Sequence, residues 1–308
     1  MTGASSQRLM DSLMSDESQA AAPLPDEGVY PIREVSRLTG VNAVTLRAWQ
    51  RRYGLVQPAR TEKGHRLYSE QDIRQIGEIL SWLERGVSIG QVKGLLSEPQ
   101  SAPVSDHWQQ TLEQFSQALL AFNQRKAEAE LGDLLASYPF ELVRSRVLQP
   151  LVERLLGLWR ERPDGELLQQ VWLGWLHTRF ARHLIEQEKG VPVTLASWGQ
   201  VGPLDLVWAA YELIGQGYEV QLLGAVEPRH ATLLEGRATP PWLILLGAGL
   251  GKQDQAAEWP EGTRFFGELG RLYDEEWRQA RDWHATLSEV SATHRTTKTR
   301  GKGGRKPS

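Results

Sequence analysis

The stretch "IREVSRLTGVNAVTLRAWQRRYGLVQPART", residues 32–61, predicts two short helices joined by a tight turn. The first helix has one apolar face, formed by Ile32, Val35 and Leu38. Gly40 supplies the turn, and the Asn42 side chain can cap the second helix. The second helix is expected to turn three apolar side chains inward: Val44, Leu46 and Trp49. This arrangement is a helix-turn-helix.

Polar and basic side chains occupy the remaining positions of the second helix. Four of them are expected to point outward: Thr45, Arg47, Arg51 and Arg52. Guanidinium and hydroxyl groups bind phosphates and the edges of bases in the major groove of DNA. The second helix is therefore the predicted DNA-reading element.

Residues 54–72, "GLVQPARTEKGHRLYSEQD", predict a hairpin followed by a helix. Pro58 and Gly64 set turns, and "GHRLY" forms the hairpin. Four side chains are presented there: Arg60, Lys63, His65 and Arg66. Such a wing reaches the DNA backbone beside the groove, where cations strengthen binding without reading sequence. Ser69 begins the next helix, with Asp72 at the capping-box position.

Residues 32–61, with "GHRLYSEQDI" (64–73) and "LERGVSIGQV" (83–92), resemble the MerR family of transcriptional regulators. The resemblance implies a winged helix-turn-helix that binds a two-fold DNA operator as a dimer. Trp49, Tyr53 and Leu67 are assigned to the core. The DNA contacts are assigned first to Arg47, Arg51, Arg66 and Tyr68, and then to Thr45, Arg52, Arg60, Lys63 and His65. Two alternatives stay open: a basic helical domain whose arginines are merely solvated, and a helix-turn-helix used for protein contacts.

Charge is segregated along the chain, which has 308 residues and a formal net charge of -3. Between Val29 and Ser97, lysine and arginine outnumber aspartate and glutamate by 11 to 6, and residues 291–308 add six bases and no acid. Residues 98–290 carry the compensating negative charge. A basic unit joined to an acidic one indicates a polyanion partner for the first unit.

Composition excludes several classes of function. The chain has no cysteine, which removes disulfides, thiolate metal sites and cysteine nucleophiles and fits a reducing cytoplasm. No apolar run approaches the roughly 20 residues that a membrane-spanning helix needs. No Ser-His-Asp order, catalytic carboxylate pair or metal-spaced histidine cluster stands out. The expectation is therefore a cytoplasmic, nucleoid-associated protein that is not an enzyme and has no membrane partner.

The expected fold class is a multidomain α plus α/β protein. Apolar residues three and four positions apart predict four helices between residues 107 and 190, which suits a four-helix bundle. From Val191, short apolar runs predict strands: "VPVTLAS", "YEVQLLGAV", "PWLILLGAG" and the weaker "TRFFGE". Between them, "GPLDLVWAAYELIGQG" and "HATLLEGRA" predict crossover helices, so the sheet is expected to be small and parallel. "RLYDEEWRQARDWHATLSEV" predicts a final helix.

Six segments follow from these patterns. They are a disordered leader (1–28), the winged helix-turn-helix (29–97), a linker (98–106), the helical bundle (107–190), the α/β domain (191–290) and a basic disordered tail (291–308).

The order of winged helix, bundle and α/β domain resembles the CarH/LitR group of MerR regulators. The resemblance implies a flavodoxin-like, cobalamin-binding type of C-terminal domain. Two motifs hold the cofactor in that group. One is a tryptophan followed ten residues later by Glu-His, above the cofactor. The other is D/E-x-H-x-x-G at the first strand–helix junction, whose histidine coordinates cobalt.

Carried over residue by residue, neither motif is intact. Trp159 is present, but Gln169 and Gln170 stand where Glu-His is expected. At the junction the acid, histidine and glycine positions hold Gln200, Gly202 and Asp205. Because an imidazole is the natural nitrogen ligand for such a metal, these vestigial positions predict that no cobalamin is bound.

The sequence therefore predicts a DNA-binding transcriptional regulator, by resemblance a repressor. Its C-terminal half would serve oligomerisation, another signal or a regulatory protein partner. The expected partners are a double-stranded DNA operator and a second copy of the chain, in a homodimer or higher oligomer. Two alternatives stay open: a light-responsive repressor that holds cobalamin without histidine, and an anti-repressor or adaptor that acts through protein contacts.

Overall fold

The computed structural model describes residues 30–97, 106–158, 162–234, 241–250, 258–260, 263–267 and 280–281. The predicted leader, the predicted tail and the linker up to residue 105 lie outside these ranges. Trp159 lies outside them as well.

The N-terminal unit consists of helices around a small antiparallel sheet. Its helical elements are α2 (Ile32–Thr39), α3 (Ala43–Ala48), the π-helical turn η1 (Trp49–Tyr53), α4 (Glu70–Glu84) and α5 (Ile89–Ser97). Its strands, in the order β1-β3-β2, are β1 (Tyr30–Pro31), β2 (Ala59–Arg60) and β3 (Arg66–Tyr68). The predicted hairpin is thus present, and β1 is a third strand beside it that the sequence patterns did not indicate.

Local chemistry sets the helix ends in this unit. Gly40 ends α2 in the left-handed conformation at φ 71°. The Asn42 side chain then caps α3, because its Oδ1 accepts a hydrogen bond from Thr45 N at 2.8 Å. Ser69 and Asp72 form a capping box at the start of α4. All three predicted signals are confirmed.

The predicted inward faces of α2 and α3 are partly wrong. Val44 is 60% exposed and Leu38 is 46% exposed, whereas Thr45 is fully buried. Residues two positions apart on a helix point about 200° apart, so Val44 and Leu46 do not share a face. The buried stripe of α3 instead passes through Thr45 and continues at Trp49, four residues on.

Helices fill the middle of the chain. They are α6 (His107–Leu120), α7 (Gln124–Ser137), the continuous run of α8 (Phe140–Val143), η2 (Arg144–Leu148) and α9 (Gln149–Leu158), and α10 (Gly165–Glu186). These are the four stretches in which helices were predicted. Contacts join α6 to α7, α9 and α10, and α9 to α10, so the helices share one core.

The C-terminal unit is a parallel sheet with crossover helices. In chain order its elements are β4 (Val191–Trp198), α11 (Asp205–Gly215), β5 (Tyr218–Ala225), α12 (Pro228–Leu234), β6 (Trp242–Leu246), β7 (Arg264–Phe266) and β8 (Ala280–Arg281). The strand order is β5-β4-β6-β7-β8. Side chains of β4 alternate between two cores, with Val193 and Leu195 on the face of α11 and Ala196 and Trp198 on the other. Both faces of the sheet are therefore covered, as is usual for parallel sheets.

The predicted final helix, residues 271–290, lies outside the described residues except at Ala280–Arg281. Those two residues pair in parallel with Phe265 and Phe266 of β7, so at this position the helix prediction is wrong.

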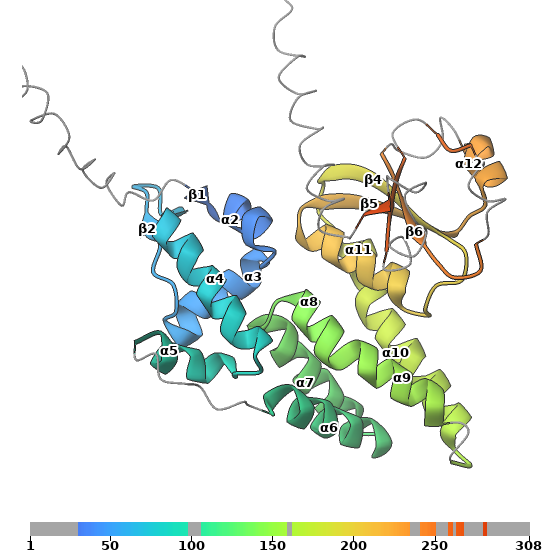
Figure 1. Cartoon of the computed structure of the whole chain (residues 1–308), viewed down its shortest axis with the longest axis horizontal. Coiled ribbons are helices and arrows are strands. Elements are labelled where there is room, and N and C mark those ends of the chain that lie inside the picture. Colours follow the sequence, from blue (N-terminus) through green and yellow to red (C-terminus); the bar gives the residue numbers. More distant parts are fainter. Residues whose placement is uncertain are drawn as a thin grey trace, which may run out of the picture.

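The N-terminal unit is seated on the central helices. A single hydrophobic cluster contains buried side chains of both units, from Val35 of α2 to Trp208 of α11. Trp49 Nε1 donates a hydrogen bond to the Ser137 carbonyl at 2.8 Å, and Trp108 Nε1 donates to the Leu83 carbonyl at 2.9 Å. In Figure 1 the blue N-terminal helices and the orange sheet lie on the same side of the green helices.

Within the described residues, no helix combines the length and apolar character needed to cross a membrane.

Replacing Trp49 with phenylalanine tests the junction between α3–η1 and α7. Trp49→Phe should lower the free energy of unfolding by about 1–3 kcal/mol, because the buried Ser137 carbonyl loses its donor. Trp208→Phe is the matched control, since Trp208 is also buried but its Nε1 has no hydrogen-bond partner among the described residues. Urea unfolding of both variants measures the difference. A loss in Trp208→Phe as large as that in Trp49→Phe would contradict this role of the Trp49 hydrogen bond.

Candidate nucleic-acid interface

The end of the predicted reading helix presents basic side chains. Arg51 and Arg52 on η1 are exposed, and Arg47 on α3 is half-buried. The π-helical turn closes with hydrogen bonds from Gly54 N and Leu55 N to the Trp49 carbonyl. Trp49 is thereby held in the core while the two following arginines face solvent.

The hairpin carries a second group of exposed side chains, namely Arg60, Lys63 and His65. Its tip is a tight turn in which Gly64 N donates to the Thr61 carbonyl at 2.8 Å and Gly64 has a φ of 79°. Because a positive φ favours glycine, Gly64 stabilises this turn. The basic side chains on either side of it stay at the surface.

A hydrogen bond joins the hairpin to the reading helix. Arg66 Nε donates to Gln50 Oε1 at 2.6 Å. Gln50 was not among the predicted site residues, although it lies between Trp49 and Arg51 in the sequence. The bond sets the position of β3 relative to η1, so the two basic groups are presented together.

Two predicted DNA contacts lie in the core instead. Thr45 and Tyr68 are both fully buried, and neither hydroxyl has a hydrogen-bond partner among the described residues. Burial also raises the pKa of Tyr68, which keeps the phenol neutral. The outward orientation expected for Thr45 is wrong, because α3 turns it toward the core. Tyr68, which was assigned as a DNA contact, is turned into the core by β3. Val44 is the side chain of α3 that is exposed in place of Thr45.

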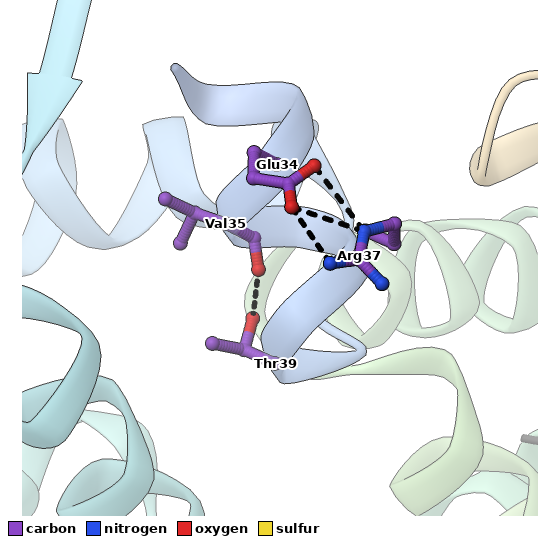
Figure 2. A network of polar contacts seen from close by, with 4 residues as sticks. All are labelled: Glu34, Val35, Arg37 and Thr39. Atoms are coloured by element: carbon purple, nitrogen blue, oxygen red, sulfur yellow. Dashed lines mark hydrogen bonds and ion pairs between the residues drawn. The ribbon is translucent and has the colours of Figure 1, made fainter. Parts of the chain in front are cut away.

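Helix α2 holds a basic residue that is already paired. Arg37 NH2 lies 2.7 Å from Glu34 Oε1, and Thr39 Oγ1 donates to the Val35 carbonyl at 2.8 Å (Figure 2). The hydrogen bonds that Arg37 donates to Glu34 raise the pKa of Arg37 above its usual value. Arg37 is therefore paired at short range with a carboxylate of its own helix, whereas Arg52 of η1 lies 4.0 Å from its carboxylate partner, Asp133.

At the other end of the molecule, the carboxyl ends of β4 and β6 meet at one edge of the parallel sheet. The chain order changes direction between these two strands, which is where open parallel sheets bind ligands. Here the backbone closes the gap, since Gln200 and Ala248 exchange two hydrogen bonds of 2.8 Å. Gly199 also lies against this bridge, and a Cβ there would stand 2.8 Å from the Ala248 carbonyl oxygen.

The first residues after β4 are held by Asp205. Its Oδ2 accepts a hydrogen bond from Gly202 N at 2.7 Å, at the start of α11. A Cβ on Gly202 would lie 2.8 Å from the same oxygen, so the carboxylate fills the space that a side chain at position 202 would need. Gln200 is exposed at this edge.

The vestigial positions that correspond to Glu-His, Gln169 and Gln170, lie on α10. Gln169 is half-buried, and the exposed Gln170 donates a hydrogen bond to Glu166 Oε1 at 3.2 Å. Among Gln169, Gln170, Gln200, Gly202 and Asp205 there is no imidazole. The described residues also contain no cluster of three or more histidine, aspartate or glutamate side chains suited to a metal.

Comparisons with known proteins agree with the N-terminal geometry. Residues 30–99 match the family described as MerR HTH family regulatory protein. Taken with the relatives below, this means that the chain belongs to the MerR family of helix-turn-helix transcriptional regulators.

The relatives include a regulator that is similar over most of the chain. The HTH-type transcriptional regulator MlrA of Salmonella typhimurium is 39% identical over 245 residues, which cover 79% of this chain and 99% of the relative. MlrA of Escherichia coli is 31% identical over 217 residues, covering 70% of this chain and 88% of the relative. The HTH-type transcriptional repressor CarH of Myxococcus xanthus is 27% identical over 141 residues, covering 41% and 46%. These relatives are regulators of transcription and not enzymes, in agreement with the prediction.

Substitution of Gly202 tests the closed junction. Gly202→Ala should lower the free energy of unfolding by about 1–3 kcal/mol, because the new methyl group displaces Asp205 from Gly202 N. Gly174→Ala is the control, since Gly174 lies in α10 with open space around it. That change should raise stability by about 0.5–1 kcal/mol through helix propensity. Thermal unfolding checks both, and a Gly202→Ala protein as stable as wild type would show that Asp205 does not occupy the site.

Proposed function

We propose that the chain binds a two-fold DNA operator as a homodimer, through a winged helix-turn-helix formed by residues 29–97. The observation that carries this proposal is the pair of exposed basic groups on η1 and the hairpin, joined by the hydrogen bond between Gln50 and Arg66. Helix η1 would enter the major groove while the hairpin follows the backbone. The proposed contacts are Arg47, Arg51, Arg52, Arg60, Lys63, His65 and Arg66.

Val44 joins the proposed interface as an apolar contact. It is exposed near the start of α3, the part of a reading helix that approaches base edges in helix-turn-helix proteins. An aliphatic side chain there suits the methyl group of thymine.

We further propose that residues 191–290 form a flavodoxin-like domain that has lost cobalamin binding. The strand order β5-β4-β6-β7-β8 supports the first part, since it corresponds to the order 2-1-3-4-5. Gly202 and its Asp205 partner support the second, since the position offers no metal ligand and its space is filled. The residues present therefore do not fit a histidine-ligated cobalt.

The remaining assignments follow from these two. The proposed segments of the chain also include a linker at 98–106, a helical bundle at 107–190 and terminal segments at 1–28 and 291–308. The acidic C-terminal half would serve oligomerisation or bind a regulatory protein. Repression is the proposed sign of regulation, by similarity to CarH, which is named a repressor.

The salt dependence of DNA binding tests the proposed interface. Duplexes selected by the wild-type protein from a random pool serve as the DNA, and fluorescence anisotropy gives the affinity across a range of salt concentrations. Arg51→Ala and Lys63→Ala should each reduce the slope of log affinity against log salt by about one, because each removes one phosphate contact.

Arg37→Ala is the matched control for this measurement. It removes the same charge from the same unit, but Glu34 already pairs that charge. The slope should therefore stay within about half a unit of wild type. Equal slopes for Arg37→Ala, Arg51→Ala and Lys63→Ala would contradict the proposed interface.

Absence of cobalamin binding is tested separately. The protein is mixed with adenosylcobalamin in the dark and passed over a gel-filtration column. Because position 202 holds no imidazole, the cobalamin absorbance should elute with the small molecules. A coloured protein peak whose spectrum changes on illumination would contradict this prediction and restore the light-responsive alternative.

A further inference from the structure

A cavity of about 270 Å³ lies between the DNA-reading unit and the central helices. Its walls come from η1 on one side and from α6 and α7 on the other, with the start of α5 at its edge. The cavity is separate from the closed sheet edge of the C-terminal unit. It is lined by Arg52 and Tyr53 at the end of the reading helix, so an occupant would contact both units at once.

Carboxylates dominate the charge of this cavity. Glu130 and Asp133, one turn apart on α7, both line it, and Arg52 is the single basic residue among the lining side chains. Glu130 Oε2 is buried and has no hydrogen-bond partner among the described residues, while Oε1 lies 3.8 Å from Lys126 Nζ. Two carboxylates against one guanidinium leave the wall with excess negative charge, which favours a cationic occupant.

Three aromatic residues also line the cavity: Tyr53 is half-buried, whereas Phe115 and Tyr138 are almost fully buried behind it. Burial raises the pKa of Tyr138 to about 12, so this phenol stays neutral. Ring faces attract cations, and they attract organic cations with weak hydration most of all. The two carboxylates and the Tyr53 ring together therefore favour a small organic cation over an inorganic one.

Arg52 already places a positive charge at this cavity. The Arg52 guanidinium lies 5.6 Å from the centre of the Tyr53 ring, and Arg52 NH2 lies 4.0 Å from Asp133 Oδ1. Both contacts are loose, and the side chain of Arg52 is 51% exposed. Arg52 thus lies near Asp133 of α7 and is at the same time exposed on the proposed DNA interface.

We propose that this cavity is an effector site for a small organic cation, which takes the place of Arg52 beside Tyr53 and Asp133. Once displaced, Arg52 turns to solvent and becomes available to a DNA phosphate. The cation therefore strengthens DNA binding, and DNA strengthens binding of the cation by the same factor. The coupling rests on the proposed DNA-binding function, whereas binding of the cation does not.

The first experiment tests the site without DNA. Benzyltrimethylammonium serves as the probe, since it has one fixed positive charge and an aromatic ring, and calorimetric titration measures its affinity for the full chain. Glu130→Gln and Asp133→Asn should each weaken binding about tenfold. Glu128→Gln, on the same helix but paired with Arg179 outside the cavity, should leave it within about twofold.

Circular dichroism and the thermal midpoint establish that each variant is folded. Absence of saturable heat up to on the order of 10 mM probe would overturn the site. Equal affinities in wild type, Glu130→Gln and Asp133→Asn would overturn it as well.

The second experiment tests the coupling. With saturating benzyltrimethylammonium, the wild type should bind its selected duplex about fivefold more tightly than in sodium chloride of equal ionic strength. Arg52→Ala should lose this gain, while Lys63→Ala, which changes a hairpin base away from the cavity, should keep it. A gain that survives in Arg52→Ala, or a wild type without one, would overturn the coupling. Loss of all DNA binding in the wild type would instead overturn the proposed function.

Discussion

The packing of Trp49 against α7 determines the position of the proposed DNA-reading surface. The indole is fully buried, and its Nε1 donates to the Ser137 carbonyl at 2.8 Å. Trp49 is the first residue of η1, so Arg51 and Arg52 are placed relative to α7 as much as to their own unit. The hydrogen bond between Gln50 and Arg66 in turn fixes the position of the hairpin relative to η1. A shift of α7 would therefore move both basic groups together.

The two ends of the molecule differ in how they use their polar groups. The N-terminal unit leaves cationic side chains at the surface, where a phosphate backbone can compete for them. The C-terminal sheet joins its backbone groups to each other at the edge where related folds bind ligands, through Gln200 and Ala248. Asp205 completes this closure by accepting from Gly202 N. The cavity beside η1 is the place where a ligand would act on the reading helix directly.

The helix caps could be predicted from the sequence, whereas the buried face of α3 could not. The caps at Asn42 and Ser69 follow from side chains that bond within three residues, and hydrophobic period located the central helices. The orientations of Val44 and Thr45 depend on which face of α3 packs against the core. Successive helical residues point about 100° apart, and hydrophobicity alone does not favour burial of Thr45 over Val44. The two-residue strand β1 has no pattern of its own, since it exists through pairing with β3. The cavity combines residues about 80 positions apart, from Arg52 to Asp133, and only tertiary packing brings them together.

This MerR-family chain is proposed to read DNA through η1 and the hairpin without cobalamin. Genome-wide mapping of bound DNA, in cells kept in the dark and in illuminated cells, tests it most directly. Discrete sites with a shared two-fold motif are expected, at the same occupancy in both conditions, and Arg51→Ala should lose them. Transcripts from the bound promoters should rise when the gene is deleted, and a fall would identify activation instead. Absence of discrete sites, or sites released by light, would contradict the account.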